Sequence, residues 1–488
     1  MEFGGSYWLT RFYFQRTLGG IYFFAFLIAL NQFRGLCGKN GIEPITLLFK
    51  HIKFWDAPSL FYFNQSDTFI IFLSILGLLI SGAAIIGLTD AYGTVLSVVS
   101  WALLWVVYMS FVNAGQTFYG FGWEILLLET GFLAIFMGPS SSQPSALPIW
   151  LLRWLLFRLM FGAGIIKLRG DECWRDLTCM QYHYETMPLP GPTSWYFHQL
   201  PVWLNKFSVL FNHFIELIIP FFYFGPRVFR NTAGVLTVIF QIIIISSGNF
   251  SWLNHVTLVI AISCFDDSFL PQLTTWTKAM GVGSADMVLA TVGGVPISVT
   301  YLVTALVVYL SFNPVRNMIS QNQIMNTSFD PLHIVNTYGA FGSITRIRDE
   351  VIIEGAEFLS GPWKEYEFKG KPGAPRRRPP FVSPYHYKID WQMWFAAMNS
   401  YRHHPWILNL VNKLLLGEKQ VIELLGPNPF PANPPKFIRA SLYEYHYSDP
   451  TDKEHWWKRE YKSEYLPALS LDNNSFREIL KSQEWLEN

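Results

Sequence analysis

Nine strongly apolar stretches alternate with short polar segments over the first 312 residues. Each is close to the roughly 20 residues that an α-helix needs to cross a bilayer. The pattern therefore predicts a polytopic α-helical membrane domain, residues 1–312, with about nine transmembrane helices and a range of seven to ten. The stretches on either side of Ser246–Asn249 form either two short spans or a re-entrant hairpin. The predicted spans are Leu18–Leu36, Phe69–Thr89, Gly93–Phe111, Gly122–Gly138, Leu147–Lys167, Phe207–Phe224, Thr232–Ser247, Trp252–Phe265 and Ile297–Phe312.

The pattern changes at about Asn313, where charged residues return and no later stretch is long enough to span. Alternating apolar and polar residues at 344–353, 366–369 and 443–447 are typical of half-buried strands. Residues 406–425 have helical spacing, and we expect that helix to end at Gly426. The sequence thus predicts a soluble, β-rich α+β domain over residues 313–488, which is large enough to bury its own core.

Composition and charge agree with this division. Of the 488 residues, 51% are hydrophobic and 15% are charged, and the formal net charge is +1. Because no basic stripe with interleaved aromatics is present, we expect the lipid bilayer as a partner and not nucleic acid. If nine spans are right, the short-loop arginines share one side, which the positive-inside rule makes cytoplasmic. The loop 168–205 and the domain 313–488 are then lumenal or periplasmic. These arginines are Arg11, Arg16, Arg153, Arg227 and Arg230.

Ionisable residues inside the spans are costly in lipid and persist there with a partner or a task. A tight linker makes the fourth and fifth spans neighbours, so we expect Glu129 to pair with Arg153 or Arg158; a proton or ion pathway is the alternative. His213 and Glu216 are three residues apart, which favours a hydrogen-bonded pair over a metal site or a proton shuttle. We predict no metal and no cofactor. The set of intramembrane polar residues is Glu124, Glu129, Arg153, Arg158, His213 and Glu216.

Lys167 ends the fifth span, after Gly162 and Gly164, which are small enough to let a helix or a ligand approach the backbone. Its ammonium group either snorkels to the membrane interface or is desolvated, with a lowered pKa, and acts as a base. A third arrangement pairs it with the charged residues that follow, from Arg169 to Asp176, and keeps it protonated.

The four cysteines are too few for a disulfide framework, and none forms a C-x-x-C pair. Cys173 and Cys179 share a loop on the predicted oxidising side, where they either form a structural disulfide or remain separate thiols. Cys37 and Cys264 end spans, where a buried cysteine behaves as a small hydrophobe. No nucleophile elbow, phosphate-binding loop, dinucleotide fingerprint or H-E-x-x-H motif is present, so the sequence favours a protein that is not an enzyme.

Residues 170–186 read GDECWRDLTCM and then, from 183, HYET; we call them the signature loop. Other ordered motifs are FGWE with LETGF in 121–132, NHFIEL at 212–217, MNT with HIVNTYGAFG in 325–342, SPYHY at 383–387 and WQMWFA at 391–396. Over Trp8 to about Leu471, these motifs resemble the lipase maturation factor family. The signature-loop residues that we single out are Asp171, Cys173, Trp174, Arg175, Asp176, Thr178, Cys179, His183, Tyr184 and Glu185.

The resemblance implies a multi-pass protein of the endoplasmic reticulum membrane with a lumenal C-terminal domain. It implies a role in the folding and assembly of secreted dimeric lipases such as lipoprotein lipase, bound as clients from the lumenal side. Bacterial relatives exist, so a bacterial inner membrane with a periplasmic domain is the other location.

A second, shorter resemblance concerns mechanism. Gly164, Lys167 and Leu168, followed by Trp174, are similar to the membrane core of vitamin K-dependent γ-carboxylase, where a lysine in this position acts as a base on the quinol. It implies an alternative function: a membrane enzyme that acts on a quinol or lipid-like substrate, with Lys167 as catalytic base. The rest of the carboxylase pattern has no counterpart that we can place on this chain.

Overall fold

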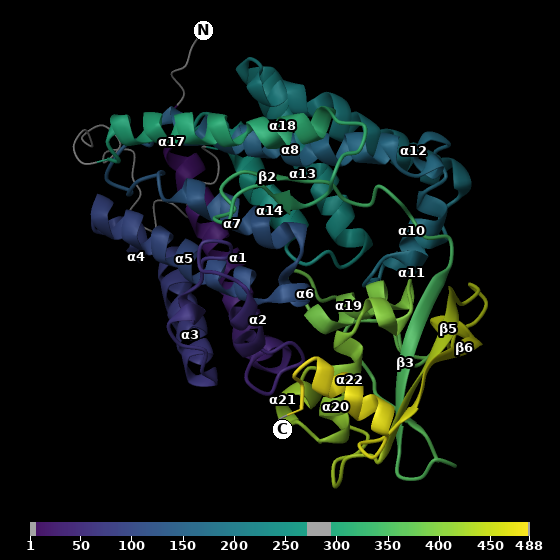
Figure 1. Cartoon of the computed structure of the whole chain (residues 1–488). Helices are drawn as coiled ribbons and strands as arrows, with labels where there is room; N and C mark the ends of the chain where they lie inside the picture. The colour runs from purple at the N-terminus through teal and green to yellow at the C-terminus, as the bar shows by residue number, and fades with distance from the viewer. Residues whose placement is uncertain (1–5, 271–293, 487–488) are drawn as a thin grey trace.

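Nine apolar helices form a bundle in the computed structural model, which describes residues 6–270 and 294–486 (Figure 1). Within these residues, seven helices are long and apolar enough to cross a membrane. With two shorter ones they follow the order of the nine predicted spans, which confirms the predicted fold class. The long helices are α1 (Trp8–Cys37), α3 (Asp67–Ile85), α5 (Thr94–Ala114), α8 (Ala146–Arg169), α12 (Val202–His213) continued by η2 (Phe214–Ile218) and η3 (Ile219–Phe224), α13 (Arg227–Ser247), and α17 (Ile297–Leu310) continued by α18 (Phe312–Ile319).

The two shorter helices are α7 (Gly122–Ala134) and α14 (Leu253–Ala261), the latter extended by η4 (Ile262–Cys264). Every residue of α7 is buried, so protein surrounds this helix on all sides. Helices α13 and α14 are separate and antiparallel, since Arg230 near the start of α13 donates to the Cys264 carbonyl at 2.9 Å. The region around Ser246–Asn249 therefore joins two helices that run in opposite directions.

Arginines gather at one end of the bundle, which we call the arginine end. Arg16 pairs with Asp90 at 2.7 Å, and Arg227 and Arg230 pair with Asp266 at 3.2 and 2.7 Å. Helix α1 begins at this end and runs toward the C-terminal domain (Figure 1). The distribution of arginines thus matches the one expected for the cytoplasmic side of a membrane protein.

Glycines allow close contact between the spans. A Cβ atom at Gly131 of α7 would overlap the Tyr22 hydroxyl of α1, and one at Gly77 of α3 would overlap the Phe26 ring. Small residues at such crossings let helices pack in a membrane, where lipid supplies no hydrophobic driving force between them. The connecting elements are α2 (Ile45–His51), η1 (Leu60–Tyr62), α4 (Leu88–Ala91), α6 (Gln116–Tyr119), α9 (Glu172–Arg175), α10 (Met180–Thr186) and α11 (Ser194–His198).

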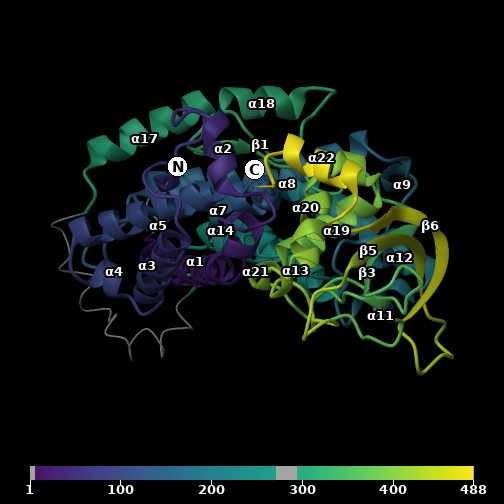
Figure 2. The ribbon, with the colours of Figure 1, turned by 60° about the horizontal axis from the view of Figure 1, so that its bottom comes forward.

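The C-terminal part contains a four-stranded antiparallel sheet of order β4-β3-β5-β6. Strand β3 pairs with β5 from Arg348 opposite Tyr445 to Ala356 opposite Phe437. Helices α19, α20 and α22 lie between this sheet and the membrane bundle (Figure 2). The elements are β1 (Thr327–Ser328), β2 (Asn336–Thr337), β3 (Arg348–Ala356), β4 (Lys364–Glu365), α19 (Lys388–Ala397), η6 (Tyr401–His403), α20 (Trp406–Leu415), α21 (Lys419–Ile422), β5 (Phe437–Tyr447), β6 (Trp457–Leu469) and α22 (Asn474–Ser482).

Several boundaries differ from the predicted ones. The last apolar helix continues past Phe312 to Ile319. The predicted helix over 406–425 breaks after Leu415, because Gly417 adopts a φ of +70° that ends it before α21. Strand β6 was not predicted, because residues 458–464 are mostly exposed on both faces and show no alternation.

Candidate functional site

The signature loop folds against the segment that follows the last span. A Cβ atom at Gly170 would overlap the Gly342 carbonyl, which accepts a hydrogen bond from the Asp171 amide at 2.8 Å. Asp171 also caps α9 through the Cys173 amide at 3.0 Å and pairs with Arg346 at 2.7 Å. The hydrogen bond from the Arg346 guanidinium lowers the pKa of Asp171 to about 2. This carboxylate therefore stays ionised at any physiological pH.

Cys173 and Cys179 form a disulfide, with their Cα atoms 4.8 Å apart, and both are buried. Trp174 packs beside them and donates its indole N–H to the Phe341 carbonyl at 2.8 Å. The disulfide thus closes a small ring that is fastened to the rest of the protein by its tryptophan. Arg175 and Asp176 in this ring are exposed, and Thr178 is half-buried.

Lys167 is buried at the end of α8 and does not snorkel; it is only 6% exposed. Its Nζ lies 2.6 and 2.7 Å from the two carboxylate oxygens of Glu216 and 3.0 Å from Asn212 Oδ1. The Trp174 ring covers the ammonium, with 5.1 Å between Nζ and the ring centroid. The partner of Lys167 is thus an acid of α12–η2 and not one of the charged residues that follow it in the chain.

The helix that carries Glu216 widens at this point. Phe214–Ile218 form a π-helical turn, a feature that is frequent at functional sites. Gly164 gives Glu216 room, since a Cβ atom on it would lie 2.9 Å from that of Glu216. His213 bonds instead through Nε2 to the Trp174 carbonyl at 3.0 Å. The predicted His213–Glu216 pair is wrong, because three-residue spacing aligns side chains in an α-helix and not across a π turn.

Glu129 of α7 and Arg158 of α8 form a buried ion pair. The pair also binds a segment that follows all the spans. Glu129 accepts hydrogen bonds from the backbone N–H and the side-chain amide of Asn336, both at 3.0 Å, and from the Tyr338 hydroxyl at 2.7 Å. Arg158 donates to the Asn336 carbonyl at 2.6 Å. The charges of the two spans therefore fasten the chain around β2 to the bundle.

Arg153, the other predicted partner of Glu129, takes no part in this contact. It donates to the Ser263 carbonyl at 2.8 Å and to the Tyr7 hydroxyl at 3.1 Å. Arg153 therefore joins α8 to the beginning of the chain and to the end of α14.

Glu124, five residues before Glu129 on α7, pairs with Lys388 of α19 at 2.7 Å, and neither side chain is exposed. The Tyr108 hydroxyl donates to the same carboxylate, and the Tyr119 ring centroid lies 3.5 Å from the Lys388 ammonium. Burial lowers the pKa of Lys388, while the negative charge of Glu124 raises it. Sequence reasoning missed this pair; the only signal was that Lys388 directly follows the SPYHY motif.

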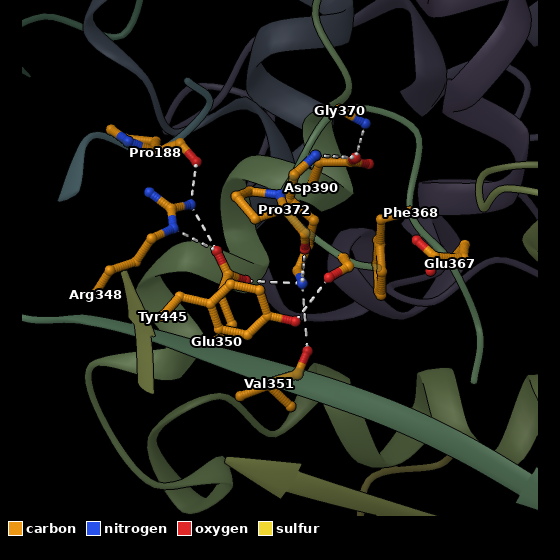
Figure 3. Close-up of polar contacts among 12 residues, drawn as sticks. Pro188, Arg348, Glu350, Val351, Glu367, Phe368, Gly370, Pro372, Asp390 and Tyr445 are labelled. Carbon is orange, nitrogen blue, oxygen red and sulfur yellow. Dashed lines mark hydrogen bonds and ion pairs between the residues drawn. The ribbon is translucent and has the colours of Figure 1, made fainter. Parts of the chain in front are cut away.

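Arg348 at the start of β3 ties the sheet to the end of the signature loop (Figure 3). Its guanidinium donates to the carbonyls of Glu185 at 2.9 Å and Pro188 at 3.0 Å and pairs with Glu350 at 2.6 Å. Lys371 holds the other carboxylate oxygen of Glu350 at 2.7 Å. All three charged side chains are buried, so each needs the others as counter-ions or hydrogen-bond partners.

The string His183-Tyr184-Glu185 does not form an acid/base set. Glu185 accepts a hydrogen bond from the Tyr447 amide at 2.6 Å, and the Tyr184 carbonyl accepts one from the Tyr447 hydroxyl at 3.2 Å. The His183 ring stacks on Phe250, and burial lowers its pKa to about 3. His183 is therefore neutral at physiological pH, and all three residues hold the loop in place.

The turn between α13 and α14 carries a further contact that sequence reasoning did not assign. The Asn249 side chain accepts hydrogen bonds from the amides of Val382 at 2.7 Å and Ser383 at 3.0 Å. It donates to the carbonyls of Pro190 at 3.2 Å and Pro380 at 2.8 Å. One buried amide thus joins the bundle, the loop after α10 and the C-terminal domain.

These groups are arranged to hold segments together and not to present a reactive group. In residues 6–270 and 294–486, no three His, Cys, Asp or Glu side chains are grouped to hold a metal. One surface hollow of 460 Å³ lies near Ser142 and Tyr301, and another of 770 Å³ lies near Glu367 and Arg377. Lys167 lines neither of them.

The fold and the site define a multi-pass membrane protein whose soluble domain is fastened to its bundle by buried charges. Residues 9–272 match the family "Lipase maturation factor transmembrane domain", and residues 334–467 match "Lipase maturation factor C-terminal domain". The chain belongs to the lipase maturation factor family.

Relatives support this assignment over almost the whole chain. The chain is 42% identical to lipase maturation factor 1 of Bos taurus and 41% identical to that of Homo sapiens; each match covers 99% of this chain and 92% or 91% of the relative. It is 31% identical to lipase maturation factor 2 of Xenopus laevis, covering 99% of this chain and 85% of the relative. No solved structure matches the chain.

Proposed function

We propose that this protein is a membrane-embedded maturation factor of the endoplasmic reticulum that assists the folding and assembly of secreted lipases. The observation that carries the proposal is the match to lipase maturation factor 1 over 99% of the chain. The arginine end then faces the cytosol. The loop 168–205 and the soluble domain, which begins after the last apolar helix ends at Ile319, face the lumen, where the lipase clients bind.

The geometry supports a role without covalent chemistry. A general base must reach the proton that it removes, whereas Lys167 is buried and bound to Glu216 and Asn212. The carboxylase alternative also has no support among the family and relatives that match. Exposed apolar side chains on the C-terminal domain, such as Phe358, Leu359 and Phe381, offer surface to an unassembled client.

The decisive experiment uses cells that lack their own lipase maturation factor and produce a dimeric lipase. We expect the wild-type chain to restore secretion of active lipase. Lys167→Arg and Lys167→Ala should retain the wild-type activity per amount of folded protein, because the lysine serves as a counter-ion. Lys419→Ala, at an exposed lysine of the C-terminal domain, is the matched control.

A catalytic base would behave differently. Loss of general-base catalysis typically costs 10²- to 10⁴-fold, so a fall of about a hundredfold or more with normal levels of folded protein would overturn the proposal. Protease protection of intact microsomes tests the location. The C-terminal domain should resist added protease until detergent opens the vesicle, and digestion without detergent would place it in the cytosol.

A further inference from the structure

Helix α7 is unusual in where it obtains its polar partners. It carries two carboxylates in 13 residues, and both are bound by chain that is made after all the membrane spans. Lys388 follows Glu124 by 264 residues, and Asn336 follows Glu129 by 207. Arg158 is present early, in the next span, whereas the counter-ion of Glu124 belongs to the C-terminal domain. Among residues 6–270 and 294–486, the one ionic partner of Glu124 is thus a lysine that is made after the membrane spans.

The docking contact around Lys388 is built from several elements of the bundle. The backbone amide of Lys388 donates to Gln32 of α1 at 3.1 Å, and the side chain of Gln392 donates to the Thr117 carbonyl of α6 at 2.6 Å. The Trp391 ring lies 4.8 Å from that of Trp123 at the start of α7. Helix α19 thus covers the ends of α1 and α7 and places its lysine between them.

We propose that docking of the C-terminal domain completes the membrane bundle, with Lys388 as a latch that closes on Glu124 after the membrane spans have been made. Before docking, the Tyr108 hydroxyl and water are the partners of the Glu124 carboxylate. After docking, water is excluded, and the carboxylate and ammonium neutralise each other. The latch does not depend on the identity of the client.

Two native thiols report on the two ends of the bundle. Cys37, at the end of α1, is fully buried and contacts the Gly115 carbonyl just before α6, on which α19 rests. A Cβ atom at the neighbouring Gly35 would overlap the Gln420 carbonyl of the C-terminal domain, so this domain covers the end of α1. Cys264 is equally buried, but it lies at the arginine end, beside Arg230. Opening of the latch should therefore expose Cys37 and leave Cys264 protected.

The test measures maleimide labelling of both thiols in the full-length protein in microsomes. Lys388→Met and Glu124→Gln each leave one charge buried without its partner, so each should raise the labelling rate of Cys37 by about a hundredfold. The double variant Glu124→Gln/Lys388→Met removes both charges and should bring the rate to within about tenfold of wild type. Cys264 should stay at its wild-type rate in all three variants, and Lys436→Met, at an exposed lysine, should change neither thiol.

Two results would overturn the latch. In the first, Cys37 remains protected in both single variants, so the pair does not hold the domain on the bundle. In the second, Cys37 and Cys264 become labelled to the same extent in both single variants, which is the behaviour of a general stabilising contact. If Lys388→Met alone fails to fold, the two thiols in Glu124→Gln decide between these outcomes.

Discussion

Helices α3 and α7 are both predicted spans, yet they differ in length, in burial and in the charged residues that they carry. Helix α3 has 19 residues, about a third of its apolar window is buried, and no Glu, Lys or Arg occurs in it. Helix α7 has 13 residues, all of them buried, and carries Glu124 and Glu129. The first is suited to lipid, whereas the second is suited to protein, because its charges find partners on α8 and on the C-terminal chain. Span length and hydropathy therefore identify the outside of the bundle better than its centre.

Of the substitutions that compare α3 with α7, breaking the Glu129–Arg158 pair of α7 should lower the stability of the protein most. Arg158→Leu leaves Glu129 buried without its counter-ion and should lower the free energy of unfolding by about 3–5 kcal/mol. The comparison on α3 is Leu79→Ala, at a side chain that is 68% exposed, which should stay within about 0.5 kcal/mol of wild type. Thermal unfolding of the purified protein in detergent measures both. Equal losses in the two variants would show that α7 is no more dependent on its partners than α3.

Two glycine-to-alanine substitutions compare the packing of α7 with that of α3 without changing any charge. Gly131→Ala on α7 forces a methyl group into the Tyr22 hydroxyl and should cost about 1–3 kcal/mol. Gly82→Ala on α3 places its methyl group in open space and should be neutral or stabilising by up to about 1 kcal/mol. The difference between their unfolding midpoints is the measurement. A tolerated Gly131→Ala would mean that α7 has freedom to shift.

The signature loop also contains a buried histidine, His183, which makes the free energy of unfolding depend on pH, whereas α3 contains no histidine. His183 has its pKa lowered to about 3 by burial, from an ordinary 6.5. Between these values the unfolded chain binds a proton that the folded protein does not, so this contribution to stability is complete above pH 6.5. It falls by about 1.4 kcal/mol per pH unit as the pH is lowered through that window.

His183→Phe keeps a ring against Phe250 and removes the titration. At pH 7.5, 6.5 and 5.5, the unfolding free energy of His183→Phe is subtracted from that of wild type. The difference isolates the histidine titration from that of carboxylates such as Asp390, whose pKa burial raises to about 6. A wild-type curve parallel to that of His183→Phe would contradict the burial of the histidine.

The sequence was sufficient to predict a contact between neighbouring spans, but it could not predict contacts between residues that are far apart in the chain. The tight linker between the fourth and fifth spans predicts that Glu129 pairs with Arg153 or Arg158, and the structure shows that the partner is Arg158. No spacing rule connects Glu124 with Lys388, or Lys167 with Glu216, since these pairs depend on tertiary packing. The π turn at Phe214–Ile218 also shifted Glu216 away from the partner that α-helical spacing assigned to it. The edge strand β6 escaped prediction for a different reason: its exposed residues 458–464 lack the alternation by which a half-buried strand is recognised.

Asn249 has a practical consequence for the mapping of membrane topology. Short polar turns between apolar helices are the usual places to insert an epitope or a reporter, because loops tolerate added residues. Here the side-chain amide of Asn249 forms hydrogen bonds with four backbone groups of two other segments. An insertion at 248–250 would separate those segments and report the topology of a damaged protein. Epitope tags therefore belong at exposed positions such as 450–451 of the turn between β5 and β6.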